Sequence, residues 1–112
     1  MLLVVEFIIF FLAAFFEILG CYSFWMVYRL EKSYYWLVIG VASLILFAYL
    51  LTKIDLEFAG RAYAIYGGIY IISSLIWLLL VEKQLFNKWD IVGALVVFIG
   101  IFIIFYGNRN LL

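Results

Sequence analysis

The sequence predicts an all-α membrane protein with four transmembrane helices per subunit. Of the 112 residues, 71% are hydrophobic and 12% are charged, and the mean hydropathy is +1.30. These values lie outside the range of soluble globular domains. The apolar residues form four runs, each near the ~20 residues that a helix needs to cross a ~30 Å hydrocarbon core.

The four runs extend over Leu2 to Tyr28, Tyr34 to Thr52, Ala62 to Val81, and Ile91 to Tyr106. The first run is too long for a signal peptide and lacks a basic segment before it, so we expect it to stay in the protein. The polar connections between the runs are too short to fold outside the membrane. We therefore expect one transmembrane domain over residues 1–112.

The first run contains a carboxylate, Glu17, near its centre. Insertion scales place the cost of an acidic residue at a helix centre at roughly +2.5 to +3.5 kcal/mol, which makes such a residue a candidate for function. At ~100° per residue, one helix face carries Phe10, Ala13, Glu17 and Gly20. The small residues Ala13 and Gly20 leave space beside the carboxylate for another helix or for a ligand.

Glu6 falls on the same face, because eleven residues make three turns plus only ~20°. It lies about 16 Å nearer the N-terminal end, at 1.5 Å per residue. There a carboxylate can reach headgroups and water. We therefore interpret Glu6 as an interfacial residue and Glu17 as the functional one.

The third run carries an aromatic stripe at spacings of three and four residues, formed by Tyr63, Tyr66, Tyr70 and Trp77 with Ser74. Such a stripe can pack against neighbouring helices, and Tyr63 and Trp77 near the ends suit a membrane interface. Tyr66 and Tyr70 lie deeper, where their hydroxyls need partners, and Glu17 is the best acceptor in the chain. A carboxylate among tyrosines suits a cation, so we predict that the stripe binds substrate.

Glycines mark two further positions. Gly67 and Gly68 remove side-chain bulk from the middle of the third run, which permits either a hinge or close helix packing. Gly93, Gly100 and Gly107 repeat every seven residues in the fourth run, so they form a smooth seam. We assign this seam to a dimer interface.

Composition excludes several classes of function. The chain has no His, one Cys and no glycine-rich phosphate loop, so metal sites, haem and ATP-driven pumping lose support. We predict no cofactor, no metal, no catalytic residue and no nucleic-acid partner. Asp90, at the start of the fourth run, is expected to cap that helix rather than to bind a ligand.

The loop cations are nearly balanced between the two sides of the membrane. The first and third loops carry Arg29, Lys32, Lys83 and Lys88. The opposite side carries Lys53, Arg61 and Arg109. Because Lys and Arg set orientation, so small a bias favours insertion in both orientations and an antiparallel, dual-topology homodimer; a single orientation is the alternative.

Three motifs together resemble the YnfA-type branch of the small multidrug resistance transporters, in the drug/metabolite transporter superfamily. They are Glu17-Ile-Leu-Gly20-Cys21-Tyr22, Gly60-Arg61-Ala-Tyr63-Ala-Ile-Tyr66-Gly67-Gly68-Ile-Tyr70-Ile, and Asp90-Ile-Val-Gly93-Ala94. The resemblance runs through nearly the whole chain. It implies an antiparallel homodimer of four-helix subunits in the bacterial inner membrane that exchanges protons for hydrophobic cations.

The resemblance also implies roles for individual residues. Glu17 corresponds to the glutamate that binds both proton and substrate, and Tyr63 and Tyr66 correspond to aromatic residues of the third helix. The chain departs from the classical members at Tyr66-Gly67-Gly68, where they usually have Trp followed by Ser-Gly, and at Tyr70, where they have a small residue. The shape of the pocket is therefore expected to differ.

The predicted function is proton-coupled export of small hydrophobic or aromatic cations, with membrane lipid around the homodimer. Proton and cation would compete for the two copies of Glu17, whose titrations would be coupled in one cavity. Alternatives are a narrower exporter of a guanidinium or amine compound, a scaffold or regulatory subunit, and a passive channel. An enzyme is least expected, because Glu17 has no chemical partner.

Overall fold

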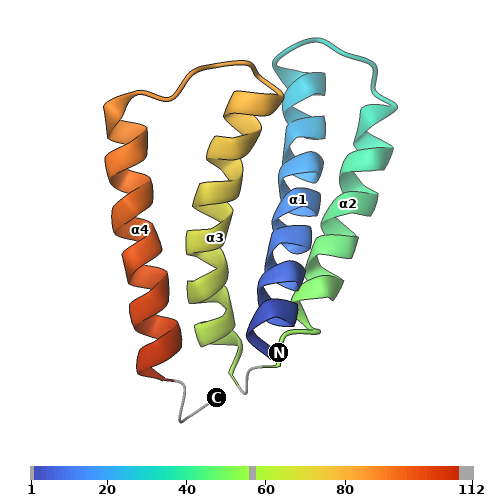
Figure 1. Ribbon diagram of the computed structural model, residues 1–112. Coiled ribbons are helices and arrows are strands. Elements are labelled where there is room, and N and C mark those ends of the chain that lie inside the picture. The colour runs from blue at the N-terminus through green and yellow to red at the C-terminus, as the bar shows by residue number, and fades with distance from the viewer. Residues whose placement is uncertain (1, 56–57, 109–112) are drawn as a thin grey trace. The chain divides into compact units, whose positions relative to one another are not determined.

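The computed structural model describes residues 2–55 and 58–108, and these form four α-helices in chain order (Figure 1). The helices are α1 (Leu2–Tyr28), α2 (Trp36–Leu51), α3 (Ala59–Leu80) and α4 (Lys88–Gly107). No strand occurs within the described residues. The all-α fold class and the number of helices are thus confirmed.

The chain divides into two compact units, Met1–Ile54 and Asp55–Leu112. The first unit is a hairpin in which α1 packs against α2, and the second is a hairpin in which α3 packs against α4. The single transmembrane domain expected over residues 1–112 stays a prediction.

Three helices are long and apolar enough to cross a membrane: α1 from Val4 to Tyr28, α3, and α4. The fourth helix, α2, is equally apolar but has only 16 residues, or about 24 Å at 1.5 Å per residue. Turns with hydrogen bonds between residues three apart continue the helix at both ends. One bond runs from Trp36 N to Ser33 O and another from Lys53 N to Leu50 O. These tighter turns lengthen the segment toward the thickness of the hydrocarbon core.

The predicted helix bounds are close for α1 and differ at the starts of α3 and α4. Both helices begin three residues earlier than their apolar runs, so Arg61, Lys88 and Asp90 lie in first turns rather than in loops. The apolar run marks the hydrocarbon depth, whereas the helix continues into the polar zone. Arg109, counted among the loop cations, lies outside the described residues.

The turns that follow α1 and α3 have the same geometry. Glu31 and Lys83 both adopt a left-handed backbone conformation, with φ of 56° and 59°. The next amide bonds back to the helix in both cases, from Lys32 N to Met26 O at 2.9 Å and from Gln84 N to Leu78 O at 3.1 Å. These bonds satisfy carbonyls that the helix ends would otherwise leave without partners.

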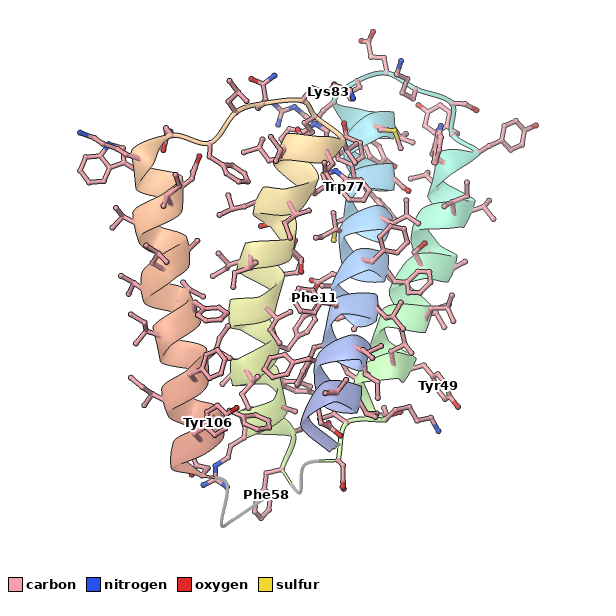
Figure 2. All side chains as sticks on the ribbon, in the orientation of Figure 1. Phe11, Tyr49, Phe58, Trp77, Lys83 and Tyr106 are labelled. Atoms are coloured by element: carbon pink, nitrogen blue, oxygen red, sulfur yellow. The ribbon has the colours of Figure 1, made fainter. Side chains whose placement is uncertain are left out.

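Cations lie over aromatic rings at several helix ends. The Arg29 guanidinium is 4.4 Å from the ring centroid of Trp25, and the Lys53 ammonium is 4.8 Å from that of Tyr49, which Figure 2 labels near the end of α2. Lys88 lies 5.0 Å from the ring of Trp89 at the start of α4. Such pairs suit the polar boundaries of a bilayer, where aromatic and basic side chains gather.

Candidate functional site

Glu17 lies in the middle of α1, on the buried face that the helical spacing predicts. Ala13 and Phe10, one and two turns before it, are 0% and 1% exposed, and Gly20 after it is also buried. Glu17 itself is partly buried. The carboxylate therefore lies along a packed helix face, far from both ends of a 27-residue apolar helix.

The space beside Gly20 is filled by α2. A Cβ atom at Gly20 would lie 2.7 Å from Leu44 Cγ and 3.0 Å from the carbonyl oxygen of Gly40. Of the two alternatives for this small residue, the structure thus shows a neighbouring helix in the space. A substrate contact at Gly20 stays a prediction.

Glu6 is more buried than expected. Its side chain is 5% exposed, whereas Glu17 is only partly buried. The expectation that Glu6 reaches water is therefore not met, although it lies near the N-terminal end of α1 as predicted. Helical spacing gives the face of a residue and its depth along the helix, but not what packs over it.

The aromatic stripe of α3 is only partly buried. Tyr66 is 7% exposed and its ring centroid lies 6.1 Å from that of Tyr70, whereas Tyr63 is 58% exposed. Trp77, labelled in Figure 2, is partly buried. The structure thus brings together Tyr66 and Tyr70, the pair that the sequence placed deepest.

Ser74, which the spacing places in the stripe, uses its hydroxyl within the helix, where it donates to Ile71 O at 2.8 Å. The preceding residue, Ser73, has a buried Oγ with no hydrogen-bond partner within the described residues. Helical spacing also places Ser73 closer than Ser74 to the line through Tyr66, Tyr70 and Trp77. Ser73 was not predicted from the sequence, although helical spacing alone places it beside these residues.

The two central glycines of α3 differ. A Cβ atom at Gly68 would collide with the Ile101 side chain and lie 3.2 Å from Val97 Cγ1, both on α4. A Cβ atom at Gly67 would meet nothing within 4 Å. Gly68 therefore serves close packing of α3 on α4. α3 runs without a break through both residues, and their role as a hinge stays a prediction.

The glycine seam of α4 is open. Added Cβ atoms at Gly93, Gly100 and Gly107 would meet no atom within 4 Å, and Ile101 is the one buried residue of α4, all of which the structure describes. The seam is therefore available to a second helix. Its assignment to a dimer interface stays a prediction.

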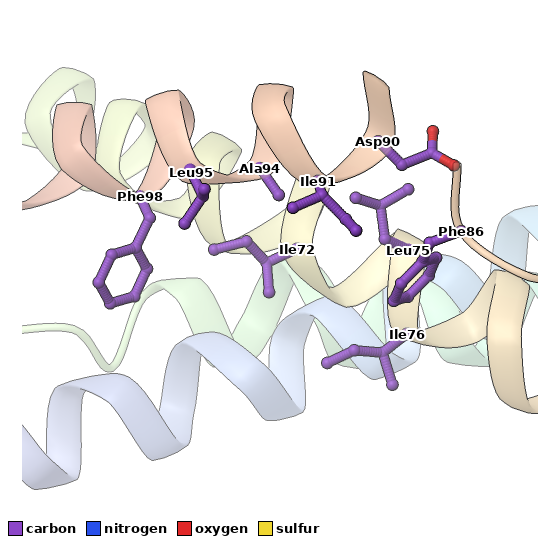
Figure 3. A pocket seen from close by; sticks show the side chains of 9 residues that line it. All are labelled: Ile72, Leu75, Ile76, Phe86, Asp90, Ile91, Ala94, Leu95 and Phe98. Atoms are coloured by element: carbon purple, nitrogen blue, oxygen red, sulfur yellow. The ribbon is translucent and has the colours of Figure 1, made fainter. Parts of the chain in front are cut away.

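A hollow of about 370 Å³ lies between α3 and α4 (Figure 3). Its lining is aliphatic and aromatic, with Asp90 as the one charged residue. The Asp90 carboxylate accepts a hydrogen bond from Asn87 N at 3.1 Å, and Asp90 N donates to Asn87 Oδ1 at 2.9 Å. This capping box confirms that Asp90 stabilises the start of α4, although Asn87 occupies the N-cap position.

Within residues 2–55 and 58–108, no group of three or more His, Cys, Asp or Glu side chains could hold a metal ion. Glu17 belongs to the first unit and the tyrosines to the second. A contact between the Glu17 carboxylate and the hydroxyls of Tyr66 and Tyr70 stays a prediction.

Comparison with known proteins decides the family. The model of the family described as "Uncharacterised BCR, YnfA/UPF0060 family" matches residues 3–110. The chain belongs to the YnfA/UPF0060 family. A "UPF0060 membrane protein" of Brucella anthropi is 50% identical over 105 residues, covering 94% of this chain and 99% of the relative. One of Ectopseudomonas mendocina, with the same name, is 51% identical over 100 residues, covering 89% and 91%.

No solved structure matches the chain. The expected YnfA-type branch is confirmed by the family match, and the relatives' names agree with the three long apolar helices in describing a membrane protein.

Proposed function

We propose that this YnfA/UPF0060 protein is a proton-coupled exporter of small hydrophobic cations. The observation that carries the proposal is Glu17, a carboxylate in the middle of an apolar helix, on a face where its neighbours are buried. A carboxylate at that depth is costly unless a proton, a cation or a polar partner compensates it. A carboxylate that binds a proton and a cation in turn can exchange one for the other across the membrane.

Competition at one carboxylate accounts for coupling. Glu17 carries one negative charge when ionised, which a bound cation neutralises, and none when protonated, which weakens cation binding. Protonation on the acidic side of the membrane therefore releases the cation. Deprotonation on the other side restores the site, so a proton gradient drives export.

The aromatic residues of α3 suit the cation rather than the proton. The Tyr66 and Tyr70 rings are neighbours on α3, and aromatic faces attract cations, the more so where water is excluded. A delocalised organic cation with apolar groups fits a carboxylate and aromatic rings better than a hydrated metal ion does.

The proposed assembly is an antiparallel homodimer in the bacterial inner membrane. The open glycine seam of α4 gives a second copy a surface for close helix approach. Near-equal loop charge on the two sides permits both orientations. Exchange between two equivalent asymmetric packings would then expose the site to each side in turn. The proposal needs no cofactor and no enzymatic step.

The test is uptake of tetraphenylphosphonium into liposomes with an acidic interior, with the membrane potential clamped by potassium and valinomycin. We expect uptake by the wild-type protein, loss of uptake in Glu17→Gln, and retention in Glu6→Gln, which alters the other carboxylate of the same helix face. Full activity of Glu17→Gln would overturn the proposal. Uncoupled flux in the wild type would indicate a channel, and no flux would favour a scaffold or regulatory subunit.

A further inference from the structure

Two adjacent serines of α3 differ in what their hydroxyls bond. Ser74 Oγ donates to Ile71 O at 2.8 Å, and in α1 Ser23 Oγ donates to Leu19 O at 2.7 Å. Ser73 Oγ is shielded from solvent and has no hydrogen-bond partner within the described residues. Ser73 thus lacks the hydrogen bond to a backbone carbonyl one turn earlier that Ser74 and Ser23 form.

A buried hydroxyl without a partner is unfavourable, because it has lost its hydrogen bonds to water without replacing them. A serine in a helix can avoid this by bonding to a carbonyl three or four residues earlier. In a native structure, such an unsatisfied group calls for a reason, and a functional role is one such reason. The position of Ser73 on α3 indicates which ligand its hydroxyl binds.

Ser73 belongs to the aromatic side of α3. At 100° per residue, Tyr66, Tyr70, Ser73 and Trp77 fall within an arc of about 60°. Gly68, whose α-carbon faces Ile101 and Val97 of α4, lies about 140° away from Ser73 around the helix. Ser73 therefore lies on a different side of α3 from the Gly68 contact with α4, in line with the residues proposed to bind the cation.

We infer that Ser73 is a specificity-determining residue whose Oγ accepts a hydrogen bond from an N–H group of the transported cation. The inference rests on the proposed function and adds a preference for amine and guanidinium cations among its substrates. A cation with an N–H group can donate a hydrogen bond to Ser73 Oγ. A quaternary cation has no N–H group and gains nothing from Ser73.

The experiment compares Ser73→Ala with Ser74→Ala, a matched control one residue away with the same chemistry. Phenylguanidinium, which has N–H donors, and tetraphenylphosphonium, which has none, serve as probes in proteoliposomes with an imposed pH gradient. We expect Ser73→Ala to raise the KM for phenylguanidinium about tenfold, the loss typical of a hydrogen bond to a charged group. The KM for tetraphenylphosphonium should stay within about twofold, and Ser74→Ala should change neither value.

Ser73→Thr keeps the hydroxyl and should restore much of the affinity for phenylguanidinium. Equal losses for both probes in Ser73→Ala would show a structural role and overturn the inference, as would unchanged KM values or the same pattern in Ser74→Ala. In each of these results, coupled uptake of tetraphenylphosphonium by the wild type would leave the proposed function standing. If the wild type carries neither probe, the proposed function fails and the inference falls with it.

Discussion

Gly20 and Gly40 face each other across the contact between α1 and α2. A Cβ atom at Gly20 would lie 3.0 Å from Gly40 O, and a Cβ atom at Gly40 would lie 3.1 Å from Gly20 O. The contact is reciprocal, so each glycine admits the backbone of the other helix. Small residues at such a position let two membrane helices approach closely.

Alanine at either glycine should destabilise the first hairpin. The added methyl group meets backbone oxygen as well as the side chain of Leu44 or Phe24, so the helices must separate, at a cost of roughly 1–3 kcal/mol. Thermal unfolding of purified protein in detergent would measure it. Gly60→Ala is the control, because nothing lies within 4 Å of its added Cβ; equal effects at Gly20 and Gly60 would contradict the packing account.

A second pair of variants separates packing from hinge motion in α3. Gly68→Ala should lower stability by roughly 1–3 kcal/mol, because its methyl group meets Ile101 of α4. Gly67→Ala should leave stability unchanged or slightly raised, since alanine favours helix. If Gly67→Ala nevertheless slows transport of tetraphenylphosphonium, the hinge prediction gains support; unchanged transport in this variant would count against it.

The turns after α1 and α3 predict a stabilising substitution. Glu31 and Lys83 have positive φ values, a conformation that costs a residue with a Cβ atom about 1–2 kcal/mol. Glycine avoids this strain, but it loses more backbone entropy on folding, which offsets part of the gain in stability. Glu31→Gly and Lys83→Gly should therefore each stabilise by about 0.5–1 kcal/mol. Lys32→Gly is the matched control in thermal unfolding, and an equal gain there would show that backbone strain is not the cause.

The capping box at the start of α4 gives a further test. Asn87→Ala removes the side-chain oxygen that accepts from Asp90 N and should destabilise by about 1 kcal/mol. Asn87→Ser keeps an acceptor and should retain most of the stability. Hydrogen exchange of the first-turn amides of α4 would locate the effect. Protection that is unchanged in Asn87→Ala would mean that the box contributes little.

The positions of the helices and the buried face of α1 could be predicted from the sequence. Hydropathy located all four, and helical spacing placed Phe10 and Ala13 on the buried side of Glu17. The starts of α3 and α4 were missed by three residues, because hydropathy reports the depth of the hydrocarbon and not the hydrogen bonding that continues outside it. Asn87, the N-cap residue, was missed for the same reason.

The candidate site was predictable only as a pattern. Helical spacing predicted that Tyr66 and Tyr70 lie together, and their rings are neighbours. It could not show that Glu6 is buried or that Ser74 and Ser73 use their hydroxyls differently. Those properties depend on rotamers and on packing across helices, which one-dimensional periodicity does not contain.

The central claim is that a proton and a cation exclude each other at Glu17, and calorimetric titration of the purified protein with tetraphenylphosphonium tests it most directly. Measured in buffers of different ionisation enthalpy, binding of tetraphenylphosphonium to the wild type should release protons, and its affinity should fall as the pH falls. Glu17→Gln should lose both effects. Wild-type affinity that is independent of pH, with no proton released, would contradict the account.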